Sequence, residues 1–261
     1  MNHERAPLTW LTMKVGFQSG TPAEPGIQAW SLDHLGFATW GPTRREVLDQ
    51  VPGKLDIHLR WMAQHQLPSR RSRNPKVEVV EEISGHEPLF GHDREPATTE
   101  EIDLAMAMLR AGHHDLVQLL DDMPDAFLGF EPPYRHFPNW ADWRTVAATL
   151  AHMANAESHY YLPMIGYEPR SATVTSGADW QDYLPSVRSD TLERLAHLRS
   201  SSDRARVQTR VRRGRRAPQG EVEEWSVRKS LRRIVRHDLL HTRSIQRIRR
   251  EWERTTGGAG P

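Results

Sequence analysis

Residues 226–250, SVRKSLRRIVRHDLLHTRSIQRIRR, decide the fold that this sequence predicts. Ser226 begins a last helix of about 28 residues, roughly 42 Å long at 1.5 Å per residue. That helix ends before residues 256–261, which we expect to form a flexible tail. His237 and His241 lie four residues apart within it, so both imidazoles occupy one helix face about one turn apart. Such a pair can reach a single metal ion.

Three earlier segments also carry the apolar spacing of amphipathic helices. Thr99 is the expected N-cap of the first, and Pro124 ends it. The predicted spans of the three helices are 99–123, 142–161 and 190–207. Four helices joined by short or moderate connections favour a bundle that buries their shared apolar stripes.

The N-terminal part has a different pattern, with apolar and polar residues alternating between turn signals. Strands are expected within residues 8–40 and over 77–83. Thr43 with Glu46 three residues later has the spacing of a capping box, and the helix that follows should run to about Gln64. This order predicts a small α/β domain.

The division between the two parts falls in residues 84–97, which are rich in Gly, Pro and charge and are interpreted as an interdomain linker. The predicted fold class is therefore α+β. An α/β domain over residues 1–90 precedes an all-α four-helix bundle over residues 98–255.

A third metal ligand is expected from a helix that faces the last one, because bundle sites are built across helices. His152 is the candidate, since Ala148, Ala151 and Ala156 leave room around it for a cavity. The chain has no cysteine, so a transition metal would rely on His, Asp and Glu. Three His with a position left open is typical of catalytic metals, whose bound water supplies hydroxide near neutral pH or is displaced by a thiolate or oxyanion. The alternative is that His237 and His241 are spaced so by chance in a chain with 14 His.

Two stretches resemble the DinB/YfiT-like family. WRTVAATLAHMANAESHYY at 143–161 is similar to its second helix, with one central His, and EEWSVRKSLRRIVRHDLLHTRSIQRI at 223–248 is similar to its last. The resemblance implies a DinB-like bundle that binds Zn, Ni, Fe or Mn through His152, His237 and His241. It further implies a homodimer and a thiol-dependent transferase or hydrolase acting on a small molecule, with a low-molecular-weight thiol as cosubstrate.

Residues 32–62 resemble the HicB-like fold, in which a strand, a Gly, a Thr and a Glu lead into a helix. Gly36, Gly41, Thr43 and Glu46 match that pattern. HicB antitoxins bind a small toxin and carry a separate DNA-binding module, which this sequence does not show. A regulatory or packing role is therefore expected for the N-terminal domain.

Further site residues are predicted around the three His. Glu157 and His159 share a helix with His152 and are candidates for acid–base catalysis, although a solvated charge is the alternative for Glu157. Arg236 is a candidate for holding an anionic cosubstrate. His113 and His114 are expected at the surface beside Asp115, and the alternative is that one of them points into the cavity.

Three tryptophans flank the helices that carry the predicted ligands. Trp140, Trp143 and Trp225 could wall a substrate pocket near the ion. Anchoring of the helix starts in the core explains them equally well.

The charge is distributed unevenly. From residue 200 onward there are 17 Lys or Arg against 7 Asp or Glu, a net of +10, and residues 1–199 carry −9. The basic third, including the predicted loop at 212–222, suggests an alternative function as a non-enzymatic protein that binds nucleic acid or an acidic partner. Docking of the acidic half onto it is the competing explanation. No apolar run or signal sequence is apparent, so a cytoplasmic protein without membrane contact is expected.

Overall fold

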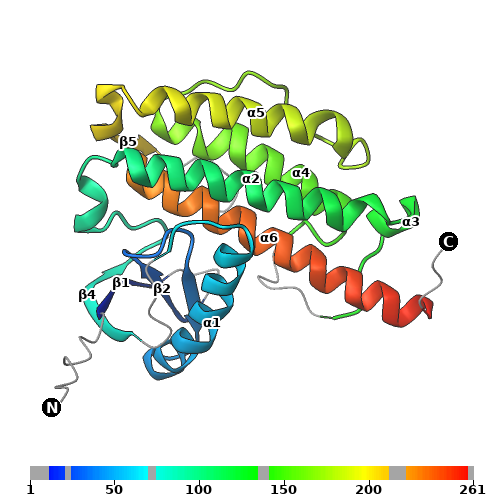
Figure 1. The fold of residues 1–261 in the computed structure, drawn as a ribbon, viewed down its shortest axis with the longest axis horizontal. Helices are drawn as coiled ribbons and strands as arrows, with labels where there is room; N and C mark the ends of the chain where they lie inside the picture. Colours follow the sequence, from blue (N-terminus) through cyan, green and yellow to red (C-terminus); the bar gives the residue numbers. More distant parts are fainter. Residues whose placement is uncertain (1–11, 21–24, 70–74, 135–140, 212–221, 258–261) are drawn as a thin grey trace, which may run out of the picture.

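The computed structural model describes residues 12–20, 25–69, 75–134, 141–211 and 222–257 (Figure 1). Its N-terminal unit is a four-stranded sheet of β1 (Thr12–Ser19), β2 (Ile27–Ser31), β3 (Ala38–Gly41) and β4 (Lys76–Ser84). The strand order is β3-β2-β1-β4, with β1 antiparallel to β2 and parallel to β4. The strands expected from sequence are confirmed.

Helix α1 (Arg44–Gln64) covers one face of this sheet. It begins as predicted, because the Thr43 hydroxyl accepts a hydrogen bond from the backbone N–H of Glu46. Its apolar side, Val47, Val51, Leu55 and Leu59, packs on Met13, Val15 and Phe17 of β1. The sheet and α1 thus form a small core of their own.

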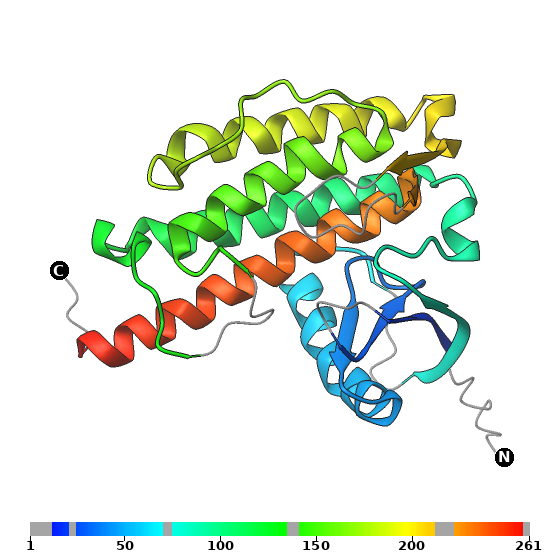
Figure 2. The ribbon, with the colours of Figure 1, turned by 180° about the vertical axis from the view of Figure 1, so that it is seen from behind.

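The bundle consists of α2 (Thr99–Asp121), α4 (Val146–Ala156), α5 (Trp180–Leu198) and α6 (Val227–Thr256), with a short α3 (Asp125–Leu128) between the first two. Helix α4 continues as a π-helical turn, η2 (Glu157–Tyr161), and a 3-10 turn, η3 (Pro163–Ile165). Figure 2 shows the four long helices lying side by side, with α6 next to the N-terminal unit. The predicted four-helix bundle is confirmed.

Several predicted helix boundaries are wrong. Thr98, not Thr99, caps α2, because its side chain and that of Glu101 bond reciprocally to the two backbone N–H groups. Helix α4 starts at Val146 rather than Asp142, after the N-cap Thr145. Helix α5 spans Trp180–Leu198 rather than 190–207, and Pro185 lies inside it.

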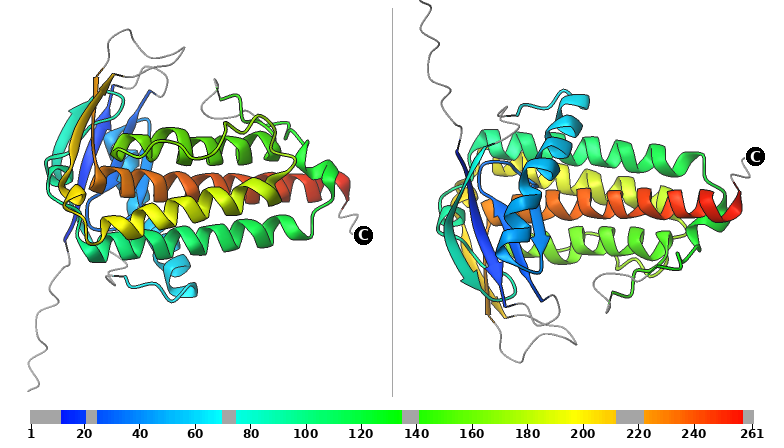
Figure 3. Two further views of the ribbon diagram at one scale, coloured as in Figure 1. Left: turned by 90° about the horizontal axis from the view of Figure 1, so that it is seen from above. Right: turned by 90° about the horizontal axis from the view of Figure 1, so that it is seen from below.

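A hairpin stands where the sequence predicted helix end and loop. After η4 (Ser202–Ala205), β5 (Val207–Val211) pairs antiparallel with β6 (Val222–Ser226). The predicted loop at 212–222 falls almost wholly outside the described residues. Figure 3 shows the hairpin at the same end of the bundle as the N-terminal sheet.

The segment between sheet and bundle is packed rather than exposed, unlike the usual interdomain linker. Phe90 is fully buried against Trp30 and Ala38, and Asp93, in the 3-10 turn η1 (Gly91–Arg94), is fully buried as well. The Asp93 carboxylate pairs with the buried Arg232 guanidinium of α6. Residues 84–97 therefore fasten the N-terminal unit to the bundle.

The sheet unit and the bundle also share apolar contacts. Trp61 and Leu104 pack against both cores. In the turn between β2 and β3, Gly36 has a φ of +71°, and a Cβ there would lie 2.6 Å from Val235 of α6. Glycine is thus needed for both backbone conformation and close approach.

The basic start of α6 is largely internal. Arg228, Lys229, Arg232 and Arg233 are all at most 8% exposed. They pair with carboxylates of α2 and of residues 84–97, the connecting segment. These carboxylates are Glu87, Asp93, Glu95 and Glu101. Docking of acidic residues onto the basic third is therefore observed.

Within the described residues, no helix is both long and apolar enough to cross a lipid bilayer.

Candidate metal centre

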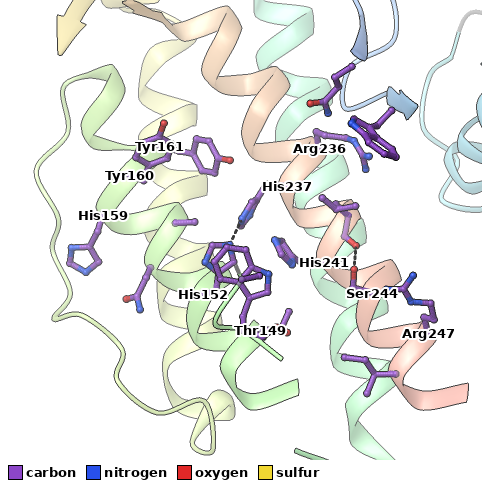
Figure 4. A pocket seen from close by; sticks show the side chains of 18 of the residues that line it. Thr149, His152, His159, Tyr160, Tyr161, Arg236, His237, His241, Ser244 and Arg247 are labelled. Carbon is purple, nitrogen blue, oxygen red and sulfur yellow. Dashed lines mark hydrogen bonds between the residues drawn. The ribbon is translucent and has the colours of Figure 1, made fainter. Parts of the chain in front are cut away.

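Three imidazoles converge in the bundle, one from α4 and two from α6 (Figure 4). One ring nitrogen each of His152, His237 and His241 lies within 4.8 Å of the other two. The Nε2 atoms of His152 and His237 are 3.0 Å apart. Two nitrogens bound at about 2.0–2.1 Å to one tetrahedral ion would be roughly 3.3 Å apart, so the observed spacing is close to that of a shared metal.

Local sequence explains how the rings meet. His237 and His241 lie one turn apart on α6. Other faces of this helix contact α2 and α5, so both rings project toward α4. The Thr145 side chain caps α4 by accepting from the N–H of Ala148, which sets His152 two turns into that helix. Small residues on α4, including Ala151 and Ala156, keep its surface low around His152.

Aromatic rings hold the imidazoles in place. Trp143 stacks on His152 with centroids 3.6 Å apart and planes 12° apart. Tyr161 meets His237 edge-on at 5.4 Å. Trp143 also lines the adjoining cavity, whereas Trp225 is fully buried in the core, and Trp140 lies outside the described residues.

Burial favours the neutral, ligating form of all three rings. It lowers the pKa of His152 to about 4. It lowers the pKa of His237 and of His241 well below the usual value, with the neighbouring imidazoles adding to the effect. Each ring therefore offers a lone pair at neutral pH.

The site also contains a buried nitrogen without a hydrogen-bond partner, Nδ1 of His241. Buried polar atoms are nearly always satisfied, and a metal ion satisfies an imidazole nitrogen as well as a donor does. With three neutral nitrogen donors and no thiolate in the chain, the ligand set fits Zn²⁺, Ni²⁺, Fe²⁺ or Mn²⁺. Three His neutralise none of the charge of such an ion.

The three His open onto a cavity of about 630 Å³. Its wall near the imidazoles is formed by Trp143, Thr149 and Tyr161. A cavity of this size suits a small organic molecule. Open coordination positions would therefore face a space that a substrate can enter.

Of the predicted acid–base residues, Glu157 does not line this cavity. It is 6% exposed, and its carboxylate lies 3.1 Å from the buried Arg188 guanidinium, which also pairs with Asp238 at 2.5 Å. Burial raises the pKa of Glu157, and Arg188 opposes the rise. The expectation of a solvated charge is wrong, because Glu157 belongs to a buried ionic cluster behind the His-bearing helices.

His159 does line the cavity, but its ring lies apart from the other three (Figure 4). Its Nε2 is buried without a hydrogen-bond partner. Arg236 lines the cavity too, with its side chain directed away from the His cluster. His114 is exposed as expected, while His113 is half-buried with its Nδ1 unpartnered.

Three cavity residues come from the N-terminal unit and were missed in the sequence. They are Gln28 of β2, Trp40 of β3 and Lys54 of α1. Contacts between segments that are distant in the chain have no periodic signal in the sequence. The rarity of lysine, with four in the chain, would have been the only hint at Lys54.

Comparison with known proteins agrees with this geometry. Residues 108–245 match the model of the DinB superfamily. Neither the comparison with curated proteins nor that with solved structures found a match. The family match begins after the N-terminal unit, so the HicB-like resemblance of that unit stays a prediction. The segment of the match includes all three converging His, and the chain belongs to the DinB superfamily.

Proposed function

We propose that this protein is a divalent-metal-dependent enzyme that acts on a small molecule, as a thiol-dependent transferase or a hydrolase. The observation that carries the proposal is the convergence of His152, His237 and His241 at the wall of a 630 Å³ cavity. When bound, the ion supplies a Lewis acid that makes a coordinated water or thiol acidic near neutral pH.

The protein's own residues orient and shield the reaction. Stacking of Trp143 fixes the ring of His152, and the edge of Tyr161 restrains His237. Both aromatic rings would limit the access of water to a bound ion on their side of the site. His159, whose Nε2 has no partner, is placed to accept or donate a proton at the cavity edge. Arg236 is placed to hold an anionic group.

Metal analysis of protein purified without a His tag tests the proposal. We expect one divalent ion per chain, retained after dialysis or restored by reconstitution. Replacement by Co²⁺ should give a visible absorption spectrum that changes when a low-molecular-weight thiol is added. Absence of stoichiometric metal after reconstitution would remove the enzymatic proposal.

The alternative of a nucleic-acid-binding protein is less well supported. Arg228, Arg232 and Arg233 are buried and ion-paired, so they are not available to phosphates. A binding titration at several salt concentrations separates the two functions, since phosphate contacts predict steep salt dependence. A weak response that does not vary with salt would exclude nucleic acid.

A further inference from the structure

The cavity extends beyond the metal centre to a second end, where two folding units meet. His237 and His241 occupy one stripe of α6, and Arg236 and Leu240 occupy the neighbouring stripe about 100° around the helix. The cavity touches both stripes and then reaches Trp40 and Lys54 of the N-terminal unit.

Arg236, which is half-buried, differs from the buried arginines at the start of α6. Arg228, Arg232 and Arg233 each pair with a carboxylate. Among the described residues, no carboxylate lies within ion-pair distance of Arg236, and its Nε is buried without a hydrogen-bond partner. A buried guanidinium is costly unless an anion compensates it. The missing anion is expected to enter from the cavity.

Lys54 brings a second positive charge to the same end. It lines the cavity and has no ion pair with any described carboxylate. Partial burial lowers the pKa of Lys54, and the nearby Arg236 guanidinium lowers it further. Two cations beside each other without an acid create a positive potential that attracts an anionic ligand.

The cavity lining also includes apolar side chains. Leu240, one turn from Arg236 on the same stripe, lines the cavity and is 43% exposed. Ala156 and Tyr160 contribute to the same wall. Large exposed apolar side chains in a cavity are typical of sites that bind the hydrocarbon part of a ligand.

We infer that Lys54 and Arg236 bind the carboxylate of an elongated organic substrate or cosubstrate, whose apolar middle contacts cavity residues such as Leu240 and whose other end reaches the three His. The inference rests on the proposed function for the metal end only. It also gives the N-terminal unit a role in substrate selection, because that unit supplies one of the two cations.

Thiols that carry a carboxylate test the inference. Co²⁺-loaded protein is titrated with ω-mercaptocarboxylates of two to six carbons and with the matching mercaptoalcohols, and Kd is read from the absorption change. At the best chain length the carboxylate should bind at least tenfold more tightly than the alcohol. Equal affinities at every length would overturn the inference and leave the proposed metal site intact.

Single substitutions locate the contact. Lys54→Gln and Arg236→Gln should each reduce the preference for carboxylate at least fivefold while changing the Kd of the mercaptoalcohol less than twofold. Arg250→Gln removes the same charge from an exposed position of α6 and should leave both values unchanged. Retention of the full preference for carboxylate in both cavity variants would contradict the inference. Because Lys54 is exposed on α1, Lys54→Gln should fold normally and keeps the test valid if Arg236→Gln does not fold.

Metal-free protein provides an arm that does not depend on the ion. Calorimetric titration with hexanoate should show binding that hexanol lacks and that Arg236→Gln removes. If Co²⁺ fails to bind but hexanoate binds in this way, the carboxylate subsite stands and the proposed metalloenzyme fails. If neither binds, both are wrong.

Discussion

His152 and His237, 85 residues apart in the chain, face each other through their Nε2 atoms at a distance of 3.0 Å. Both rings are neutral at pH 7 because burial lowers their pKa values. At most one nitrogen of such a pair can donate a proton to the other, and that hydrogen bond leaves His241 unsatisfied. A shared ion satisfies all three nitrogens at once.

Replacing a ligand should remove the metal without unfolding the bundle. We expect His241→Ala to lose stoichiometric metal, measured by mass spectrometry of the purified protein, while far-UV circular dichroism keeps its helical signal. The reason is that buried apolar residues of α2, α4, α5 and α6 hold the bundle together. His114→Ala, at an exposed position, serves as the control and should retain the metal.

Complete unfolding of His241→Ala would instead make the ion structural. A chelator gives an independent measurement on the unmodified chain. Removal of the ion should lower Tm, because bound metal stabilises the folded chain. The free energy of unfolding lost is about 2.7 kcal/mol relative to protein with free metal at one hundred times Kd. The metal-free protein should still melt in a cooperative transition.

Metal binding should resist mild acid. Protons compete for His152 only as the pH falls toward its pKa of about 4, and the other two rings have pKa values well below the usual one. The metal Kd should therefore change little between pH 8 and about 5.5, whereas ordinary histidines with pKa near 6.5 would already weaken binding below pH 7. Equilibrium dialysis at each pH measures this, with circular dichroism to confirm the fold. Steep loss of metal at pH 6 would contradict it.

The ion pair between the connecting segment and α6 should be important for stability. Asp93→Asn leaves Arg232 buried without its charge partner, so we expect a loss of about 3 kcal/mol in the free energy of unfolding. Urea unfolding followed by circular dichroism measures it. Glu251→Gln breaks a more exposed pair with Arg254 and should not change the midpoint measurably. Equal midpoints for both variants would show that the connecting segment does not fasten the two units.

Two glycine substitutions should have opposite signs. A Cβ at Gly112 of α2 would lie 2.2 Å from Asp238 Oδ2, whose carboxylate is held by Arg188. Gly112→Ala should destabilise by about 2 kcal/mol, because the clash exceeds the gain of up to about 1 kcal/mol in helix propensity. Gly53→Ala of α1 meets nothing within 4 Å and should stabilise by roughly 0.5–1 kcal/mol. Thermal unfolding compares the two, and stabilisation by Gly112→Ala would show that α2 and α6 do not pack as described.

The sequence could predict those parts of the fold that depend on local periodicity. The spacing of His237 and His241 and the Ala-rich surroundings of His152 predicted that the three rings converge, as they do in the structure. The Thr43 cap predicted the start of α1. These features depend on spacings of three or four residues within one helix, so they can be recognised without knowing what packs against them.

Other parts depend on partners that are distant in the chain. The helix predicted over 190–207 misses the first half of α5, where packing of Trp180 and Leu184 in the core keeps the segment around Pro185 helical. The composition of residues 84–97 indicated an interdomain linker, but it could not show that Asp93 pairs with Arg232, 139 residues away. Lys54 could not be assigned to the cavity, because only docking of α1 on the bundle places it there.

X-ray absorption spectroscopy of the untagged, metal-loaded protein tests the central claim most directly, because it counts the imidazoles around the ion. We predict three nitrogen ligands from imidazole at about 2.0–2.1 Å if the ion is Zn²⁺, together with at least one exchangeable light ligand. The imidazole signal should be lost in His152→Ala, His237→Ala and His241→Ala alike. An ion bound with fewer than three imidazoles, or metal retained unchanged in all three variants, would contradict a three-histidine metal site.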